Sequence, residues 1–206
     1  IGLCNIEVIG ALTKGRQGKE LAEVGDMTEA GAVAFSDDGN FVESARGMLN
    51  ALDYLRAFEK TIICHEEETS LVGEGGMNEG HRSAMLGIKG RPTVAEDIAV
   101  ARDILLAEYA DARVHIAHIS SARSVELVRE AKRRGIRVTA EATPHHLTMT
   151  DDVVDYTDSA TKVNPPLRSK KDTEAVLQGL LDGTIDAIVT DHSPHAEEEK
   201  DREYIY

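Results

Sequence analysis

The chain has 206 residues, 23 of them basic and 37 acidic, which gives a formal net charge of −14. Because phosphate groups would repel so acidic a surface, the charge argues against binding to nucleic acid or to an anionic membrane. Hydrophobic residues make up 41% and charged residues 29%, as in a folded globular protein rather than a disordered one.

Six short apolar runs rich in valine, isoleucine and alanine predict β-strands. In chain order they are residues 5–12, 32–36, 61–65, 113–119, 136–142 and 185–190. The runs lack a regular polar alternation, which is typical of parallel strands covered on both faces. None of them approaches the roughly 20 apolar residues of a membrane helix, and we expect neither a membrane span nor a signal peptide.

The stretches between these runs have the period of amphipathic helices. Thr93 and Glu96 have the spacing of a capping box, and the apolar stripe that follows comprises Ile98, Ala101 and Leu105. Three further helices are indicated by a capping residue or an apolar period near Met48, Ser121 and Asp172.

The alternation of strands and helices, at roughly 25 to 30 residues a repeat, indicates βαβ units. The fold is therefore either an open doubly wound sheet or a (β/α) barrel. No Gly-x-Gly-x-x-Gly motif or P-loop follows the first strand, which excludes the commonest chemistry of doubly wound sheets. Residues 66–92 form a long insertion after a strand, where either fold places its active-site loops.

The cysteine content bears on the cellular compartment. Cys4 and Cys64 lie in apolar runs and have no Cys-x-x-Cys spacing. We expect both to be buried thiols, and therefore expect a reducing, cytoplasmic environment.

Acidic or histidine side chains stand at the ends of four predicted strands. They are the Asp37-Asp38 pair, of which the strand end alone does not single out either member, together with His65, His118 and Asp191. Because the carboxyl ends of barrel strands meet at one mouth, these side chains are expected to converge there. Two imidazoles and two carboxylates suit a zinc-type site with nitrogen and oxygen ligands. Each residue alone also fits a turn or a structural histidine, and spacing does not decide whether His115 or His118 faces the barrel.

Five sequence motifs carry a family resemblance. They are Ala34-Phe35-Ser36-Asp37-Asp38-Gly39, His118-Ile119-Ser120, Thr143-Pro144-His145-His146-Leu147, Lys162-Val163-Asn164-Pro165-Pro166-Leu167-Arg168 and Thr190-Asp191-His192-Ser193-Pro194-His195. In this order the motifs closely resemble the dihydroorotases, and within them the bacterial-type branch, which belongs to the amidohydrolase superfamily. The resemblance extends over essentially the whole chain.

The resemblance implies roles for individual residues. The metal ligands that it implies, for one or two Zn²⁺ ions, are Asp38, His65, His118 and Asp191. Asp191 also corresponds to the family's catalytic proton shuttle, and the substrate contacts correspond to Asn164 and His195. His145 and His146 receive no ligand role.

The same resemblance implies a fold and an activity. The fold is α/β, a TIM-type (β/α) barrel, of which residues 1–206 would supply about strands three to eight as a single partial catalytic domain. The activity is the reversible interconversion of dihydroorotate and N-carbamoyl-aspartate in de novo pyrimidine biosynthesis. The resemblance further implies a homo-oligomer, which in some relatives associates with aspartate transcarbamoylase.

The family's N-terminal His-x-His pair and its C-terminal end have no counterpart here, since no histidine precedes His65. We therefore expect this chain by itself to be inactive. Two alternatives stay open at this point. One is a hydantoinase or an allantoinase, although those families usually have a carboxylated lysine where this chain has Asp38. The other is a non-catalytic, dihydroorotase-like scaffold subunit.

Overall fold

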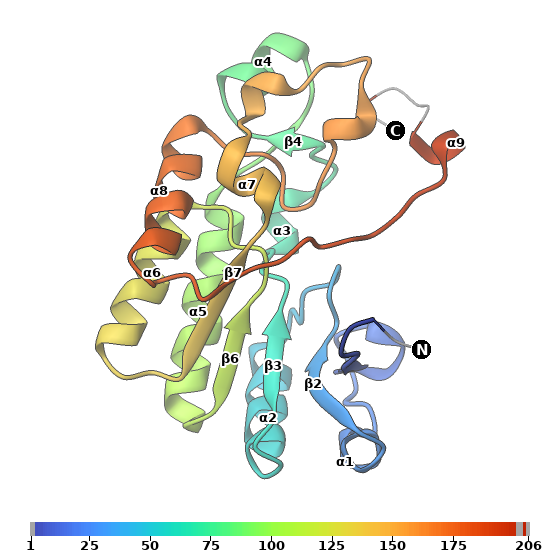
Figure 1. The fold of residues 1–206 in the computed structure, drawn as a ribbon, viewed down its shortest axis with the longest axis vertical. Helices are drawn as coiled ribbons and strands as arrows, with labels where there is room; N and C mark the ends of the chain where they lie inside the picture. The colour runs from blue at the N-terminus through green and yellow to red at the C-terminus, as the bar shows by residue number, and fades with distance from the viewer. Residues whose placement is uncertain (1–2, 201–203, 205–206) are drawn as a thin grey trace.

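The computed structural model describes residues 3–200 and 204, and within them the main sheet has six parallel strands, of which β2, β3, β6 and β7 are labelled in Figure 1. They are β1 (Val8–Ala11), β2 (Ala32–Ser36), β3 (Thr61–Cys64), β6 (Arg113–Ile116), β7 (Val138–Ala142) and β8 (Ala187–Ile188). Each strand pairs in parallel with the one before it, so the order in the sheet is the order in the chain. A doubly wound sheet reverses its strand order at a switch point, whereas a barrel wall does not. The incomplete (β/α) barrel expected from the sequence is therefore confirmed.

The longer helices form a layer outside this sheet. They are α1 (Val24–Glu29), α2 (Ala45–Arg56), α5 (Val94–Ala110), α6 (Ala122–Arg133) and α8 (Lys170–Leu181). Along the layer α2 packs beside α5, α5 beside α6 and α6 beside α8 (Figure 1). The main core lies between the helices and the sheet, where Phe35, Ile62 and Ile116 are fully buried. By contrast, Val33 of β2 and Ile188 of β8 do not belong to this core and are exposed.

Residues 66–92 fold beside the carboxyl end of β3. They contain α3 (Thr69–Val72), β4 (Met77–Asn78), α4 (His81–Leu86) and β5 (Gly90–Arg91), with β4 and β5 paired in parallel. A Cβ at Gly90 would lie 2.5 Å from the Cα of Glu79, so only glycine allows this close approach. A second apolar cluster packs the insertion against later parts of the chain, and its buried members are Met77, Ile88, Val154, Leu167 and Tyr204.

Short elements complete the described chain. They are η1 (Lys14–Arg16), α7 (Pro144–Thr148), η2 (Asp151–Val153), η3 (Ser159–Thr161) and α9 (Glu197–Lys200). All six predicted strands are present, although most are shorter than predicted. Ser121 caps α6 as predicted, since its Oγ accepts two backbone N–H groups of the first turn. Asp172 does not cap α8, which begins at Lys170; its Oδ1 instead accepts the backbone N–H of Ala122 at 3.0 Å.

The capping box and the apolar stripe predicted for α5 are both wrong. Thr93 forms no side-chain cap, and Glu96 turns toward the loop after β6. Ile98 and Leu105 are exposed, while residues on another face of the helix, such as Ile104, are buried. Apolar residues occur on two faces of α5, so periodicity alone does not say which face packs against the sheet.

The two cysteines differ in their surroundings. Cys64 is buried as predicted, but Cys4 is exposed because the first strand begins only at Val8. Both thiols are free. The terminal residues Ile1 and Tyr206 of the predicted 1–206 domain lie outside the described residues.

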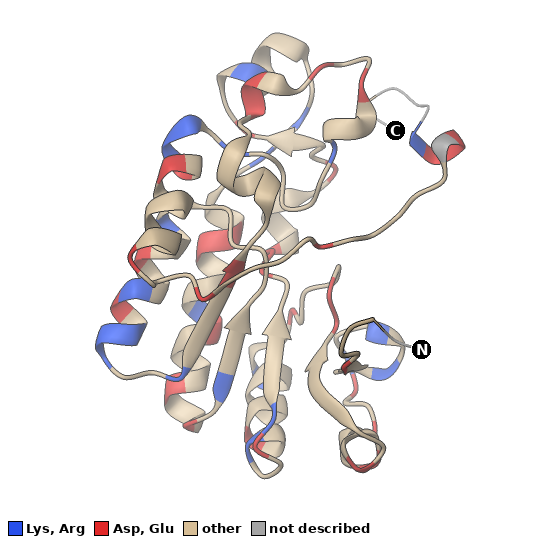
Figure 2. Cartoon of the chain, viewed as in Figure 1, with Lys and Arg blue, Asp and Glu red and all other residues tan. Residues whose placement is uncertain are grey.

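Acidic and basic positions are mixed along the outer helices α6 and α8 (Figure 2). Arg129 and Lys132 of α6 lie 2.8 Å from Asp182 and 2.7 Å from Asp186, which ties α6 to the segment that leads into β8. Within residues 3–200, no helix is both long enough and apolar enough to span a bilayer.

Candidate functional site

Asp38, His65 and His118 meet at the carboxyl end of the sheet. They follow β2, β3 and β6, which are neighbours in the sheet although Asp38 and His118 are 80 positions apart. His118 Nε2 lies 3.1 Å from His65 Nδ1 and 3.2 Å from Asp38 Oδ1. His65 Nδ1 lies 3.5 Å from the same oxygen. The parallel register therefore brings three potential ligand atoms into mutual contact.

The three atoms have the spacing of ligands around one tetrahedral metal ion. With bonds of about 2.0–2.1 Å, the ligand atoms of tetrahedral zinc are about 3.3 Å apart, and the observed distances are 3.1–3.5 Å. Three protein ligands leave a fourth position for water or substrate, as in catalytic rather than structural zinc sites. The residues present thus fit a metal ion.

The charges of this cluster are coupled. Hydrogen bonds from His118 and then His65 hold the pKa of Asp38 well below its usual range. Burial lowers the pKa of His65, but hydrogen bonding to Asp38 and Glu67 outweighs burial and raises the pKa to about 9. The Asp38 carboxylate therefore favours a positive charge beside it, and a bound metal cation would supply such a charge.

His118 and Asp191 have unusual backbone conformations, with φ of 32° and 50°. Residues other than glycine rarely enter this left-handed region, which costs about 1–3 kcal/mol. Such strain persists where the surrounding structure imposes it, and it concentrates at functional sites.

His115 lies away from this cluster. Its Nδ1 is 2.7 Å from Thr139 Oγ1 and its Nε2 is 2.9 Å from Glu141 Oε2, both on β7. The sequence does not decide which of His115 and His118 belongs to the cluster. The structure places His118 beside Asp38, because the chain leaves β6 after Ile116 and turns.

A cavity of about 620 Å³ opens at this end of the sheet. The six residues singled out from the sequence all line it, namely Asp38, His65, His118, Asn164, Asp191 and His195. Asn164 Nδ2 lies 3.2 Å from His65 Nε2. Asp191 and His195 are outside the three-residue cluster, and His195 Nδ1 is 3.4 Å from Glu199 Oε2. The structure therefore joins four of the six through direct contacts and places Asp191 and His195 around the same cavity.

Sequence reasoning missed the basic residues that line this cavity. They are Arg16, Arg91, Lys162 and Lys200. Arg16 Nη1 donates to the backbone oxygen of Asp38 at 3.0 Å. Burial and the nearby charges of Arg91 and Lys200 lower the pKa of Lys162. Cations that face one cavity in a chain of net charge −14 favour an anionic small molecule. Lys162 lies in one of the five motifs, so its position in that motif could have pointed to it.

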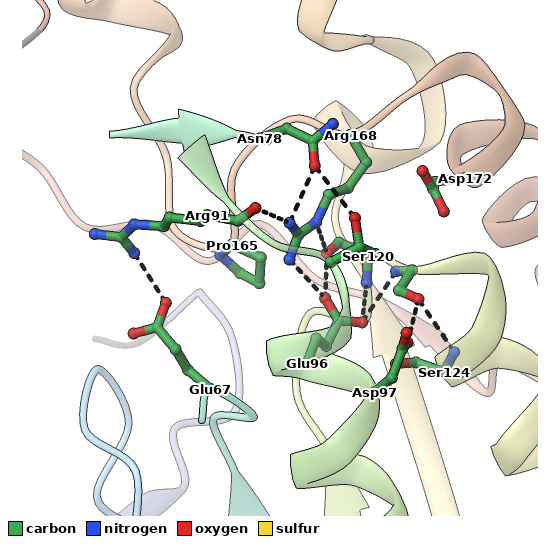
Figure 3. Close-up of polar contacts among 12 residues, drawn as sticks. Glu67, Asn78, Arg91, Glu96, Asp97, Ser120, Ser124, Pro165, Arg168 and Asp172 are labelled. Carbon is green, nitrogen blue, oxygen red and sulfur yellow. Dashed lines mark hydrogen bonds and ion pairs between the residues drawn. The ribbon is translucent and has the colours of Figure 1, made fainter. Parts of the chain in front are cut away.

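A buried ion pair supports the loops around the cavity (Figure 3). Arg168 Nη2 lies 3.4 Å from Glu96 Oε2, and these side chains are 5% and 2% exposed. Arg168 also donates to Ser120 Oγ at 3.0 Å and to Asn78 Oδ1 at 3.2 Å. Glu96 accepts two backbone N–H groups of the loop after β6, each at 3.0 Å. One guanidinium thus connects the insertion, α5 and the loops after β6 and η3.

A second group of potential ligand atoms is formed by Cys64, Glu66 and Asp103, all buried. Burial and the Asp103 charge raise the pKa of Glu66 well above its usual range. The Arg102 guanidinium already lies in this group, with Nε 2.6 Å from Asp103 Oδ1. That cation balances the Asp103 carboxylate, so Asp103 suits a buried ion pair better than a metal ligand, whereas neither oxygen of Glu66 has a hydrogen-bond partner among the described residues.

His146 has a structural position, whereas His145 lines the cavity. The Nε2 of His146 donates to the backbone oxygen of Pro165 at 3.0 Å, and its Nδ1 lies 2.8 Å from Thr143 Oγ1. Burial, followed by the neighbouring His145, lowers the pKa of His146 to about 3. The neutral imidazole therefore holds the loop that carries Asn164.

The lowered pKa of His146 predicts that the protein loses stability in acid. Between pH 6.5, the usual histidine value, and pH 3, the unfolded chain binds a proton at His146 that the folded chain does not. The free energy of unfolding should therefore fall with falling pH, by about 1.4 kcal/mol per pH unit from this residue. Urea unfolding of the wild type and of His146→Gln at pH 7 and pH 5 measures the difference. Equal pH dependence in the two proteins would contradict the prediction.

Parallel strands in chain order, outer helices and imidazole and carboxylate side chains at the strand ends define part of an amidohydrolase-type (β/α) barrel. Solved structures agree with this class. L-hydantoinase (dihydropyrimidinase) from Arthrobacter aurescens is similar with a TM-score of 0.74 and 25% identity, over 94% of this chain and 44% of that one. D-hydantoinase (dihydropyrimidinase) from a Thermus species has a TM-score of 0.72 at 21% identity, over 93% and 43%.

Sequence comparisons narrow the class to a family. A family described as dihydro-orotase-like matches residues 3–124. The dihydroorotase of Pelotomaculum thermopropionicum is 59% identical over 203 residues, and that of Pelobacter propionicus is 53% identical over 203 residues. The chain therefore belongs to the dihydroorotase-like family, as its motifs indicated. In both comparisons the match covers 98% of this chain and 48% of the relative, so the chain spans about half the length of these relatives.

Proposed function

We propose that residues 1–206 are part of a single catalytic domain of a zinc-dependent dihydroorotase, which interconverts dihydroorotate and N-carbamoyl-aspartate in pyrimidine biosynthesis. The observation that carries the proposal is the contact among Asp38, His65 and His118, whose ligand atoms lie 3.1–3.5 Å apart. The basic lining of the same cavity supports it, because both substrates are carboxylates.

In this proposal Asp38, His65 and His118 hold one metal ion, and Asp191 is a ligand of a second metal position, of which this chain supplies only a part. When bound, the metal supplies Lewis-acid activation of water and of the amide carbonyl. The Asp191 carboxylate accepts the proton of the attacking water and delivers it to the ring nitrogen as the amide bond breaks. Asn164 and His195 contact the substrate and hold the ring in register. The reverse sequence closes the ring of N-carbamoyl-aspartate.

A cytoplasmic location and assembly into a homo-oligomer, with aspartate transcarbamoylase as a partner, belong to the same proposal. The two free thiols support the location, because disulfides are rare in reducing compartments. The oligomer rests on the family resemblance.

A chimeric enzyme tests the activity. In it this chain replaces the matched 203-residue segment of the Pelotomaculum thermopropionicum dihydroorotase, to which it is 59% identical. We expect the chimera to bind zinc and to open dihydroorotate but not hydantoin or allantoin, and the 206-residue chain alone to show no turnover. A folded chimera that opens hydantoin or allantoin instead would favour that cyclic amidohydrolase. One that binds no zinc would favour a non-catalytic scaffold.

A further inference from the structure

On the side of His65 that faces away from Asp38, one neighbouring atom is a hydrogen-bond donor and another is an acceptor. His65 Nε2 lies 3.2 Å from the amide nitrogen of Asn164 and 3.8 Å from Oε2 of Glu67. Asn164 Nδ2 can only donate a hydrogen bond, whereas a carboxylate can only accept one. The protonation of Nε2 therefore decides which of the two neighbours it can bond.

Arg91, at the end of the insertion, fixes both neighbours. Its Nη1 donates to Glu67 Oε1 at 2.9 Å, as Figure 3 shows, and to Asn164 Oδ1 at 2.7 Å. Because a guanidinium only donates, the oxygen of Asn164 faces Arg91 and its amide nitrogen is left toward His65. Arg91 itself is held through its backbone oxygen, which accepts from Arg168 Nη1 at 3.4 Å.

Glu67 has an oxygen placed to accept a proton from His65. Its side chain is 19% exposed, and its Oε1 is paired with the Arg91 guanidinium at 2.9 Å. Because a carboxylate has several acceptor sites, its Oε2, which lies 3.8 Å from His65 Nε2, can still accept a hydrogen bond.

A metal ion on His65 Nδ1 changes the requirements at the other ring nitrogen. The ring proton must then be on Nε2, and histidine ligands commonly donate that proton to a carboxylate or a carbonyl. Asn164 Nδ2 cannot receive it, while Glu67 Oε2 can after closing the 3.8 Å gap.

We propose that Glu67, held by Arg91, is the positioning residue that accepts the Nε2 proton of metal-bound His65, and that this bond releases the Asn164 amide nitrogen from His65. Metal binding and the orientation of a substrate contact are then coupled through one imidazole ring. The inference rests on the proposed metal site formed by Asp38, His65 and His118.

Zinc affinity of the 206-residue chain, measured by competition with a chromogenic chelator, tests the inference without an activity assay. Loss of a hydrogen-bond partner of a metal-bound histidine typically weakens metal binding about 10–100-fold. We therefore expect the zinc affinity of Glu67→Ala to be about 100-fold lower than that of the wild type. The zinc affinity of Glu67→Gln should lie between those of the wild type and Glu67→Ala, about 10-fold below the wild type, because the glutamine amide oxygen can still accept the hydrogen bond. Asn164→Ala should bind zinc at least as tightly as the wild type, since Asn164 no longer bonds His65 in the metal-bound state.

Glu74→Gln is the matched control, because it removes an exposed carboxylate from the same insertion and should leave zinc affinity within about twofold. Far-UV circular dichroism and thermal melting of each metal-free variant separate misfolding from a lost positioning contact. Wild-type affinity in folded Glu67→Ala, or a 10-fold loss in folded Asn164→Ala, would overturn this inference alone. If the wild-type chain binds no zinc, the proposed metal site fails and the inference fails with it.

Discussion

Replacement of Glu96 by alanine is expected to lower the free energy of unfolding by about 3–5 kcal/mol, because it leaves the buried Arg168 guanidinium without its charged partner. The two side chains are almost completely buried and lie 3.4 Å apart. The variant would also remove the acceptor of two buried backbone N–H groups, at Ser120 and Ser121. Urea unfolding of the chain, followed by circular dichroism at pH 7, measures the loss.

The matched control is Glu130→Ala on α6. Glu130 Oε2 lies 3.4 Å from Arg133 Nη1, the same separation, but these side chains are 56% and 62% exposed. Solvent screens such a pair, so its loss should cost less than about 1 kcal/mol. Similar losses in the two variants would contradict the assignment of Glu96 and Arg168 as a buried support. In a double variant, Glu96→Leu with Arg168→Met, much of the stability should return, because no unpaired charge is then buried.

Replacement of Asp191 by asparagine in the chimeric enzyme is expected to reduce turnover of dihydroorotate by about 10²–10⁴-fold, the usual contribution of a positioned proton acceptor. Asparagine has similar size and polarity but cannot accept the proton of water at neutral pH. Zinc should remain bound, because Asp38, His65 and His118 already form a cluster without Asp191. Steady-state kinetics and metal analysis of the same preparation measure the two effects.

Asp152→Asn is the control for this variant. It makes the same chemical change at an exposed carboxylate that does not line the cavity, and should leave turnover unchanged. Near-wild-type turnover in Asp191→Asn with stoichiometric zinc would exclude Asp191 as the proton shuttle. Loss of zinc together with turnover would show that Asp191 is needed to hold the metal ion.

The buried network has a consequence for the site. Arg168 connects Asn78 of the insertion with Ser120, two residues after His118, and it lies four residues after Asn164. Loops that carry functional side chains are usually mobile unless something holds them. Here one guanidinium holds three of them, so the positions of the candidate ligands and of Asn164 depend on residues that contact neither metal nor substrate.

The sequence by itself determined the strands and the residue types at their ends. Apolar runs without polar alternation predicted parallel strands, and the strand ends at Asp37-Asp38, His65 and Asp191 follow directly from reading the chain. The family followed from motifs, since five short segments in a fixed order identify it without any structure. These are local properties of the sequence, and local patterns are what sequence reading detects.

Only the tertiary structure decided what depends on contacts between distant segments. It put His118 rather than His115 beside Asp38, through a turn with φ of 32° that spacing does not reveal. It turned Glu96 away from its predicted cap toward Arg168, 72 positions along the chain. It also buried one apolar face of α5 and exposed the other. The physical reason is common to all three: a side chain bonds or packs with what the folded chain brings beside it, and that partner is not encoded within the local pattern.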